Sequence, residues 1–90
     1  MLIQAITYRA LDPVTVTTSA VKLFGADYTR KSLTILNKGN EDMYVYPEDS
    51  NPNNNFIVPV GTGVDVSPPP VNAFYAYTLT GTTSAEIVEG

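Results

Sequence analysis

The sequence predicts an all-β protein: one small β-sandwich domain that spans residues 1–90 in about eight short strands. Three observations support this prediction. Seven prolines and six glycines are spread along the chain, so turns recur at the spacing of about 8–12 residues that is typical of sandwiches and barrels. The short apolar runs alternate with polar residues, and no run repeats every 3.6 residues. Ninety residues also provide for only one hydrophobic core.

Five strands are predicted in the first half of the chain. Each alternates apolar with polar side chains, the pattern of a strand with one buried face. They are Met1–Tyr8, Val14–Thr17, Val21–Leu23, Lys31–Asn37 and Asp42–Tyr46. Lys38-Gly39-Asn40 predicts a turn, because Gly and Asn both tolerate positive φ. The segments compatible with a helical turn are Ser19–Lys22 and Ala26–Thr29.

Four more strands are predicted after an exposed loop. The loop is Pro47–Asn55, which contains no large apolar side chain. The strands are Phe56–Val60, Val64–Val66, Asn72–Leu79 and Ser84–Val88. Because Pro59 lacks an N–H group, its strand is expected to lie at a sheet edge or to end there. Gly61-Thr62-Gly63 is predicted to be a hairpin turn, since Val66 stands where a phosphate-binding loop needs its third glycine.

Composition excludes most kinds of chemistry. The chain contains no Cys and no His, which removes disulfides, thiolate metal sites, cysteine nucleophiles and imidazole catalysis. Its nine carboxylates are expected to be solvated surface charges. We therefore expect no enzymatic activity, no cofactor and no resident metal.

Charge and hydropathy limit the classes of partner that we expect. Five Lys and Arg against nine Asp and Glu give a net charge of −4, and five scattered cations make no basic face for phosphates. No apolar run approaches the roughly 20 residues that cross a bilayer, and the first residues do not form a signal-peptide pattern. We therefore expect neither a nucleic-acid nor a membrane partner, and synthesis in the cytoplasm.

One loop motif is similar to a calcium site. Asp49, Asn51 and Asn53 have the spacing that opens a helix-loop-helix calcium loop, but Asn54 and Val60 replace its glycine and its bidentate glutamate. That type of site is excluded. An incidental calcium site and an Asn-rich loop held by Asx turns remain as alternatives.

Four tyrosines are the candidate contact residues. Tyr44 and Tyr46 lie two residues apart on one predicted strand, and Tyr75 and Tyr77 do so on another, so each pair shares one face. If both strands expose that face, the rings form a patch that binds proteins or sugars. If the face lies between the two sheets, the rings fill the core and the hydroxyls reach its rim.

The segment Ala20–Gly39 contains the pattern R-x-x-L-x-I-x-N-x-G, which runs from Arg30 to Gly39. A Tyr/Val strand follows at Met43–Tyr46, and a segment that contains proline and glycine at Val58–Val66. An aromatic strand at Asn72–Tyr77 and a short last strand at Ala85–Val88 complete the pattern. This arrangement resembles small virion proteins of tailed bacteriophages, from about residue 14 to the C-terminus. The resemblance implies a jelly-roll-like sandwich.

The resemblance also implies a function without assigning a role to any residue. It predicts a capsid cement or decoration subunit that binds the outer shell and stabilises it. The expected partners are the major capsid protein or another virion protein, and copies of the chain itself in a dimer or trimer. The expected location is the capsid surface after synthesis in the host cytoplasm. The alternative is a carbohydrate- or receptor-binding module of a phage fibre or tail, which would use the four tyrosines and the loop Asn51–Asn55.

Overall fold

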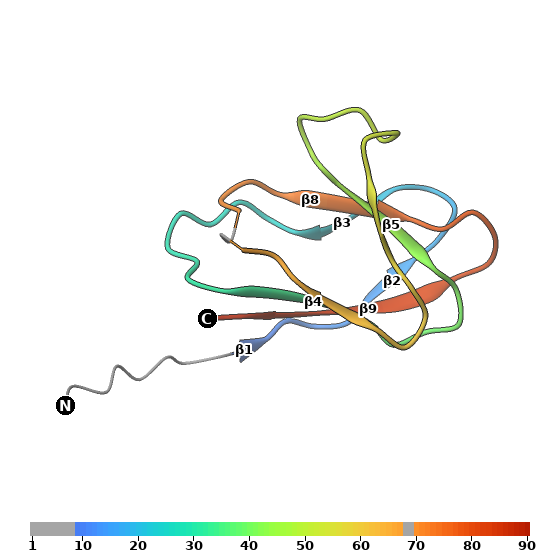
Figure 1. The fold of residues 1–90 in the computed structure, drawn as a ribbon, viewed down its shortest axis with the longest axis horizontal. Coiled ribbons are helices and arrows are strands. Elements are labelled where there is room, and N and C mark those ends of the chain that lie inside the picture. The colour runs from blue at the N-terminus through green and yellow to red at the C-terminus, as the bar shows by residue number, and fades with distance from the viewer. Residues whose placement is uncertain (1–8, 68–69) are drawn as a thin grey trace.

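The computed structural model describes residues 9–67 and 70–90, which form two antiparallel β-sheets packed face to face (Figure 1). The predicted all-β sandwich is thus confirmed. The described residues form nine strands, two of which pair successive parts of one neighbour. The predicted strand Met1–Tyr8 lies outside the described residues.

Each sheet has a simple strand order. Sheet I contains β1 (Arg9–Ala10), β2 (Val14–Val16), β4 (Leu33–Asn37), β7 (Gly63–Asp65) and β9 (Thr83–Glu89). Sheet II contains β3 (Val21–Phe24), β5 (Met43–Pro47), β6 (Phe56–Val58) and β8 (Phe74–Tyr77). In sheet I, β1 and β2 both pair with β9, and the order continues β9-β4-β7. In sheet II the order is β3-β8-β5-β6.

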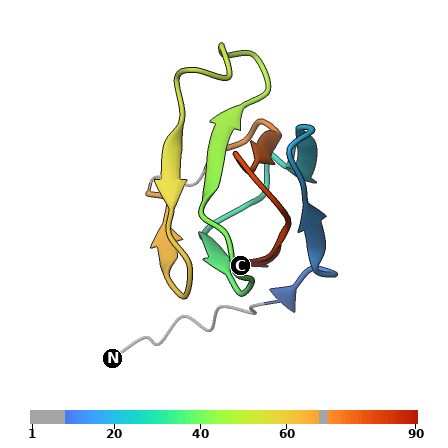
Figure 2. The same cartoon turned by 90° about the vertical axis from the view of Figure 1, so that its right-hand side faces the viewer.

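The chain changes sheet at every connection from β2 onward except the one between β5 and β6. Figure 2 shows the two layers from the side. The orders β2-β9-β4-β7 and β3-β8-β5-β6, with these crossings, are those of a jelly roll, so the jelly-roll-like prediction is confirmed. The strand β6 lies at the edge of sheet II and ends at Val58, just before Pro59, as the missing N–H group predicts.

The hairpin predicted at Gly61-Thr62-Gly63 is wrong. These residues connect β6 in sheet II with β7 in sheet I, so the turn passes between the layers. Gly61 has a φ of 74°, and the Thr62 N–H group donates to the Pro59 carbonyl at 3.1 Å. The glycine chemistry therefore predicts the turn correctly, but it does not tell which sheet the next strand joins.

The described residues contain no helix, and therefore no helix that is long and apolar enough to cross a membrane. Both segments compatible with a helical turn adopt other structures. Strand β3 begins at Val21, immediately after a turn in which the Ser19 N–H group donates to Thr17 Oγ1 at 3.2 Å. The Thr29 N–H group donates to Asp27 Oδ1 at 2.8 Å, which makes an Asx turn.

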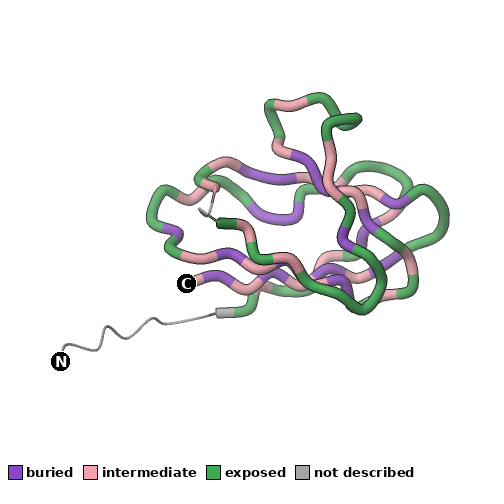
Figure 3. Tube along the Cα trace, in the orientation of Figure 1, coloured by how far each residue is buried: buried purple, intermediate pink, exposed green. Residues whose placement is uncertain are grey.

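The core lies between the two sheets. Every second residue of β4 and β9 is buried, and Figure 3 shows this alternation along the trace. Leu33 and Ile35 of β4 are 2% and 0% exposed, and Met43 and Val45 of β5 meet them from sheet II with no exposed surface. Each such side chain contributes about 1.5–3 kcal/mol through its removal from water.

Arg30 is buried at one end of the sandwich. Its Nε lies 3.0 Å from Glu89 Oε2 at the end of β9, and its two terminal nitrogens donate to the carbonyls of Pro70 and Gly25 at 2.6 and 3.0 Å. The guanidinium carbon lies 4.7 Å from the centre of the Phe24 ring. One side chain thus connects the residues after β3, before β8 and at the end of β9.

Asn37 holds the opposite end of β4 in a comparable way. Its side chain is 2% exposed, and Nδ2 donates to the carbonyls of Glu41 and Val58 at 2.7 and 2.9 Å. Its Oδ1 accepts hydrogen bonds from Thr83 Oγ1 at 2.6 Å and from the Gly39 N–H group at 3.2 Å. All four polar partners are therefore satisfied by one amide.

Gly39 is needed for space and not for its φ. The predicted turn at Lys38-Gly39-Asn40 lies between β4 and β5, and it forms without positive φ, which among the described residues only Gly61 and Gly81 have. A Cβ atom on Gly39 would lie 2.6 Å from Thr83 Cα and 2.5 Å from the Ser84 nitrogen. The turn after β4 therefore passes against the backbone of β9.

Candidate functional site

The four tyrosines lie together on the outer face of sheet II. The inward residues of β5 are Met43 and Val45, and those of β8 are Phe74 and Ala76, all of them buried. The alternating tyrosines must therefore point away from the other sheet. The alternative in which this face lies between the two sheets is wrong, although Tyr46, which stacks on Tyr75 and lies beside Tyr77, is only 7% exposed. We call Tyr44, Tyr46, Tyr75 and Tyr77 the tyrosine face.

Strand register stacks these rings in pairs. Tyr44 is opposite Tyr77 with ring centres 5.4 Å apart and planes 16° apart, and Tyr46 is opposite Tyr75 at 6.0 Å and 24°. Tyr46 also lies 6.0 Å from the Tyr77 ring. Aromatic pairs of this kind contribute about 0.5–1.5 kcal/mol each beyond the area they bury. The stacking gives the face a fixed shape before any partner binds.

Three other side chains extend the tyrosine face. Ile57 of β6 pairs with Tyr44 and is 48% exposed, and Leu79 follows β8 with 66% of its surface exposed. On the other side Lys22 of β3 pairs with Tyr75, which places its exposed side chain on the same face. The sheet thus presents aromatic and aliphatic groups next to one cation.

The loop between β5 and β6 borders the tyrosine face and rises above the body of the molecule in Figure 1. Asn55 Nδ2 donates to the Tyr77 hydroxyl at 3.1 Å and to the Pro52 carbonyl at 2.9 Å. The Asn53 N–H group donates to Asn51 Oδ1 at 2.9 Å, so the predicted Asx turn is present. Within the described residues no group of three His, Cys, Asp or Glu side chains gathers as metal ligands.

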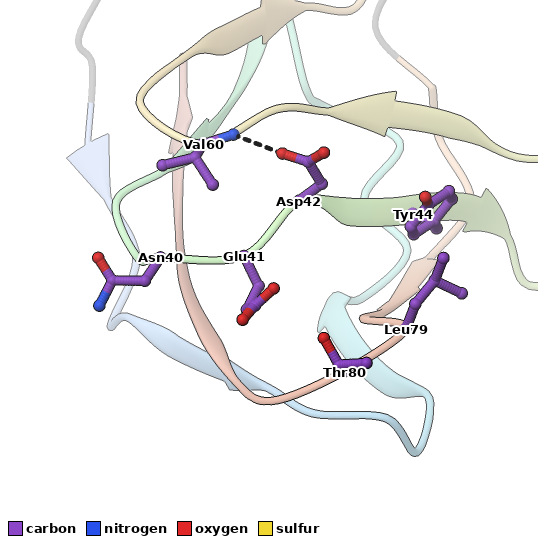
Figure 4. Close-up of a pocket in the computed structure, with 7 residues that line it drawn as sticks. All are labelled: Asn40, Glu41, Asp42, Tyr44, Val60, Leu79 and Thr80. Atoms are coloured by element: carbon purple, nitrogen blue, oxygen red, sulfur yellow. Dashed lines mark hydrogen bonds between the residues drawn. The ribbon is translucent and has the colours of Figure 1, made fainter.

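A shallow hollow of about 460 Å³ lies where the tyrosine face meets the connection between β4 and β5 (Figure 4). Its lining residues are Asn40, Glu41, Asp42, Tyr44, Val60, Leu79 and Thr80. Asp42 Oδ1 accepts a hydrogen bond from the Val60 N–H group at 3.0 Å, which fixes the carboxylate at the rim. The hollow therefore combines apolar walls with two carboxylates.

The sequence indicated the four tyrosines but neither Ile57, nor Leu79, nor the hollow. Leu79 lies two residues after Tyr77, so the alternation that linked the tyrosines also predicts its side of the sheet. Ile57 joins them only through the pairing of β6 with β5, which no local pattern specifies. The assembled surface of rings, hydroxyls and aliphatic groups is suited to binding a surface that is partly apolar and partly polar.

Comparison with known proteins adds no assignment to this geometry. No protein-family model, no curated protein and no solved structure matches the chain. Any function must therefore be inferred from the fold, the tyrosine face and the residues around it.

Proposed function

We propose that the protein is a non-enzymatic structural protein of a phage virion: a decoration subunit that binds the outside of the capsid shell and stabilises it. It is made in the host cytoplasm and acts on the virion as a dimer or trimer. The observation that supports this proposal best is the tyrosine face with the exposed Ile57 and Leu79 beside it. Tyrosine is enriched at protein interfaces because its ring contacts apolar surface while its hydroxyl still bonds.

Two other features agree with a structural role. The jelly roll is an architecture of viral capsid domains, although it also serves lectins and enzymes, so the fold supports the proposal by analogy only. The pattern from Arg30 to Gly39 resembles small phage virion proteins. A subunit of this type needs a rigid fold and a surface that fits its partner, and the stacked tyrosines supply such a surface.

The first test is the copy number of the chain in purified particles. Quantitative mass spectrometry against the major shell protein measures it directly. We expect a number of copies comparable to that of the shell subunits. A handful of copies per particle contradicts decoration and favours a vertex or tail location, and complete absence contradicts a virion role altogether.

The second test measures stabilisation of the shell. Particles that lack the protein should break at lower temperature and under milder osmotic shock than complete particles. Adding back the purified protein should restore resistance, whereas an Ile57→Ser variant should restore it less well because it places a hydroxyl on the contact surface. Thr15→Ser, on an exposed position of sheet I, is the matched control and should act like the unmodified chain. Equal resistance with and without the protein contradicts the proposal.

A carbohydrate- or receptor-binding module of a phage fibre or tail is the second candidate. The hydrogen bond from Asn55 to the Tyr77 hydroxyl supports it, because it places an amide beside a half-buried aromatic ring. Sugars stack on such rings and bond to such amides. Binding on a glycan array that is lost in Tyr75→Ala would favour this function, and an array without signal contradicts it.

A further inference from the structure

The hairpin of β5 and β6 carries charge of one sign only. Residues 39–60 contain four carboxylates, no Lys and no Arg. Glu41 and Asp42 precede β5, and Glu48 and Asp49 follow it, so carboxylates lie at both ends of the strand that carries Tyr44. The ion pairs formed in the described part of the chain, Arg30 with Glu89 and Lys38 with Glu86, include none of the four. A cation brought by a partner therefore meets no competing Lys or Arg on this hairpin.

The hollow beside the tyrosine face combines that charge with exposed apolar surface. Leu79 and Val60 are 66% and 45% exposed and line it together with Tyr44. In Figure 4 the carboxylates of Glu41 and Asp42 lie to the left of Tyr44 and Leu79.

An arginine side chain fits this lining. Its methylene stem is apolar and packs on aliphatic walls, while its guanidinium remains charged at the tip. The guanidinium binds carboxylates with two parallel hydrogen bonds and also stacks on aromatic rings. Within the described residues Asp42 uses only Oδ1, for the Val60 N–H group, and the Glu41 carboxylate makes no hydrogen bond, so three carboxylate oxygens can accept.

We propose that the hollow binds an arginine side chain presented by a partner protein, with the stem on Leu79 and Tyr44 and the guanidinium on Glu41 and Asp42. The apolar neighbours of that arginine then rest on the tyrosine face near Ile57. This inference rests on the proposed function, in which the partner is a shell protein, and it specifies the chemistry that the shell must offer.

The test needs no capsid. The ¹⁵N-labelled protein is titrated with the peptide acetyl-Gly-Arg-Gly-amide, and amide shifts are followed by NMR. The matched peptide carries citrulline, which has nearly the same shape as arginine but no charge. We expect saturable shifts confined to residues 40–44, 60 and 79–80, with about fivefold weaker binding of the citrulline peptide, as for a partly exposed ion pair. Shifts that never saturate, or that are equal for both peptides, overturn the inference.

A protein variant removes the charge without changing the shape. Glu41→Gln with Asp42→Asn should lose the preference for arginine over citrulline, and the Asn side chain can still accept from Val60. Asp12→Asn is the matched control, because Asp12 is exposed in the connection between β1 and β2. If Asp12→Asn abolishes the preference equally, general attraction to an acidic protein explains the binding and the inference fails. If the double variant does not fold, Glu41→Gln alone is compared with the same control.

The two proposals fail separately. Arginine binding in the hollow by a protein that is absent from virions would contradict the proposed function and leave the site standing. Abundant copies on the capsid, with no arginine preference in the titration, would leave the function standing and refute this site.

Discussion

The segment Arg30–Gly39 and the tyrosine face differ in where their polar atoms find partners. In the first, the buried guanidinium of Arg30 and the buried amide of Asn37 bond to groups from distant parts of the same chain. In the second, Tyr44, Tyr75 and Tyr77 also contact residues far along the chain, but they keep part of their surface in solvent. The first region is organised to hold the sandwich together, and the second leaves capacity for contact with another molecule.

The pattern behind the family resemblance is thus largely a pattern of folding. Leu33 and Ile35 are core residues, Arg30 and Asn37 satisfy buried polar groups, and Gly39 allows close approach to β9. Each position is explained by the sandwich itself. The resemblance therefore supports the jelly roll more directly than it supports any partner, and contact must be sought where the pattern does not reach.

Arg30→Ala should have the largest effect on stability. It removes a buried guanidinium that contacts Glu89, the carbonyls of Pro70 and Gly25 and the Phe24 ring, and breaking a buried ion pair costs about 3–5 kcal/mol in other proteins. Urea unfolding followed by circular dichroism measures the change. Lys31→Ala, at the exposed neighbouring position, should change stability by less than about 0.5 kcal/mol. Similar losses of stability for the two variants would contradict the role of the buried Arg30 in holding the sandwich together.

Asn37→Ala should rank second, at about 3 kcal/mol. The carbonyls of Glu41 and Val58 and the hydroxyl of Thr83 lose their partner, and each buried polar group left alone costs about 1–3 kcal/mol before water or rearrangement compensates. Thr15→Ala, at an exposed position of β2, is the control. A loss below 1 kcal/mol for Asn37→Ala would mean that water replaces the amide without difficulty.

Gly39→Ala should cost about 2 kcal/mol, as typical overpacking does. The new methyl group meets the backbone of Thr83 and Ser84, which belong to β9 and cannot move without disturbing sheet I. Gly25→Ala provides the contrast, since no atom lies within 4 Å of its added Cβ and its φ is not positive. That variant should be neutral or slightly stabilised because the unfolded chain loses freedom. Equal losses in thermal midpoint would contradict the steric explanation.

The sequence predicts those features of the fold that depend on neighbouring residues, and it does not predict those that depend on distant ones. Alternation is local, so it predicts the strands and the inward direction of Leu33 and Ile35. It cannot choose between faces when both are apolar, as in β5, where Met43 and Val45 alternate with tyrosines. Burial of an arginine is not readable either, because the Arg30 partner Glu89 is 59 positions away.

The candidate site, like the fold, was predicted only where it depends on local spacing. Spacing grouped the tyrosines within each strand, and the structure adds the register that pairs Tyr44 with Tyr77 and brings Ile57 beside them. The hollow requires the connections after β4, β6 and β8 to meet, which depends on the crossing of the chain between sheets. Long-range pairing of this kind leaves no local signal.

Tyr77→Phe should have a small effect on global stability, about 0.5–1 kcal/mol, because it removes one hydroxyl that Asn55 and Pro52 contact and keeps the stacked ring. Its main consequence should be local. Amide hydrogen exchange in residues 52–55 should accelerate while exchange in β4 and β9 stays unchanged. Uniform acceleration across the domain would show that the loop and the core unfold together.

Leu79→Ser should have the smallest effect on folding and separates the two regions most directly. Leu79 is 66% exposed, so replacing it should change the free energy of unfolding by less than about 0.5 kcal/mol. If Leu79 contacts the partner and does not stabilise the fold, the same variant should associate less well with purified particles in a sedimentation assay. Unchanged association, with unchanged stability, would place the contact elsewhere on the sandwich. A clear loss of stability would show that this exposed leucine supports the fold, and that the tyrosine face resembles the segment Arg30–Gly39 more than its exposure indicates.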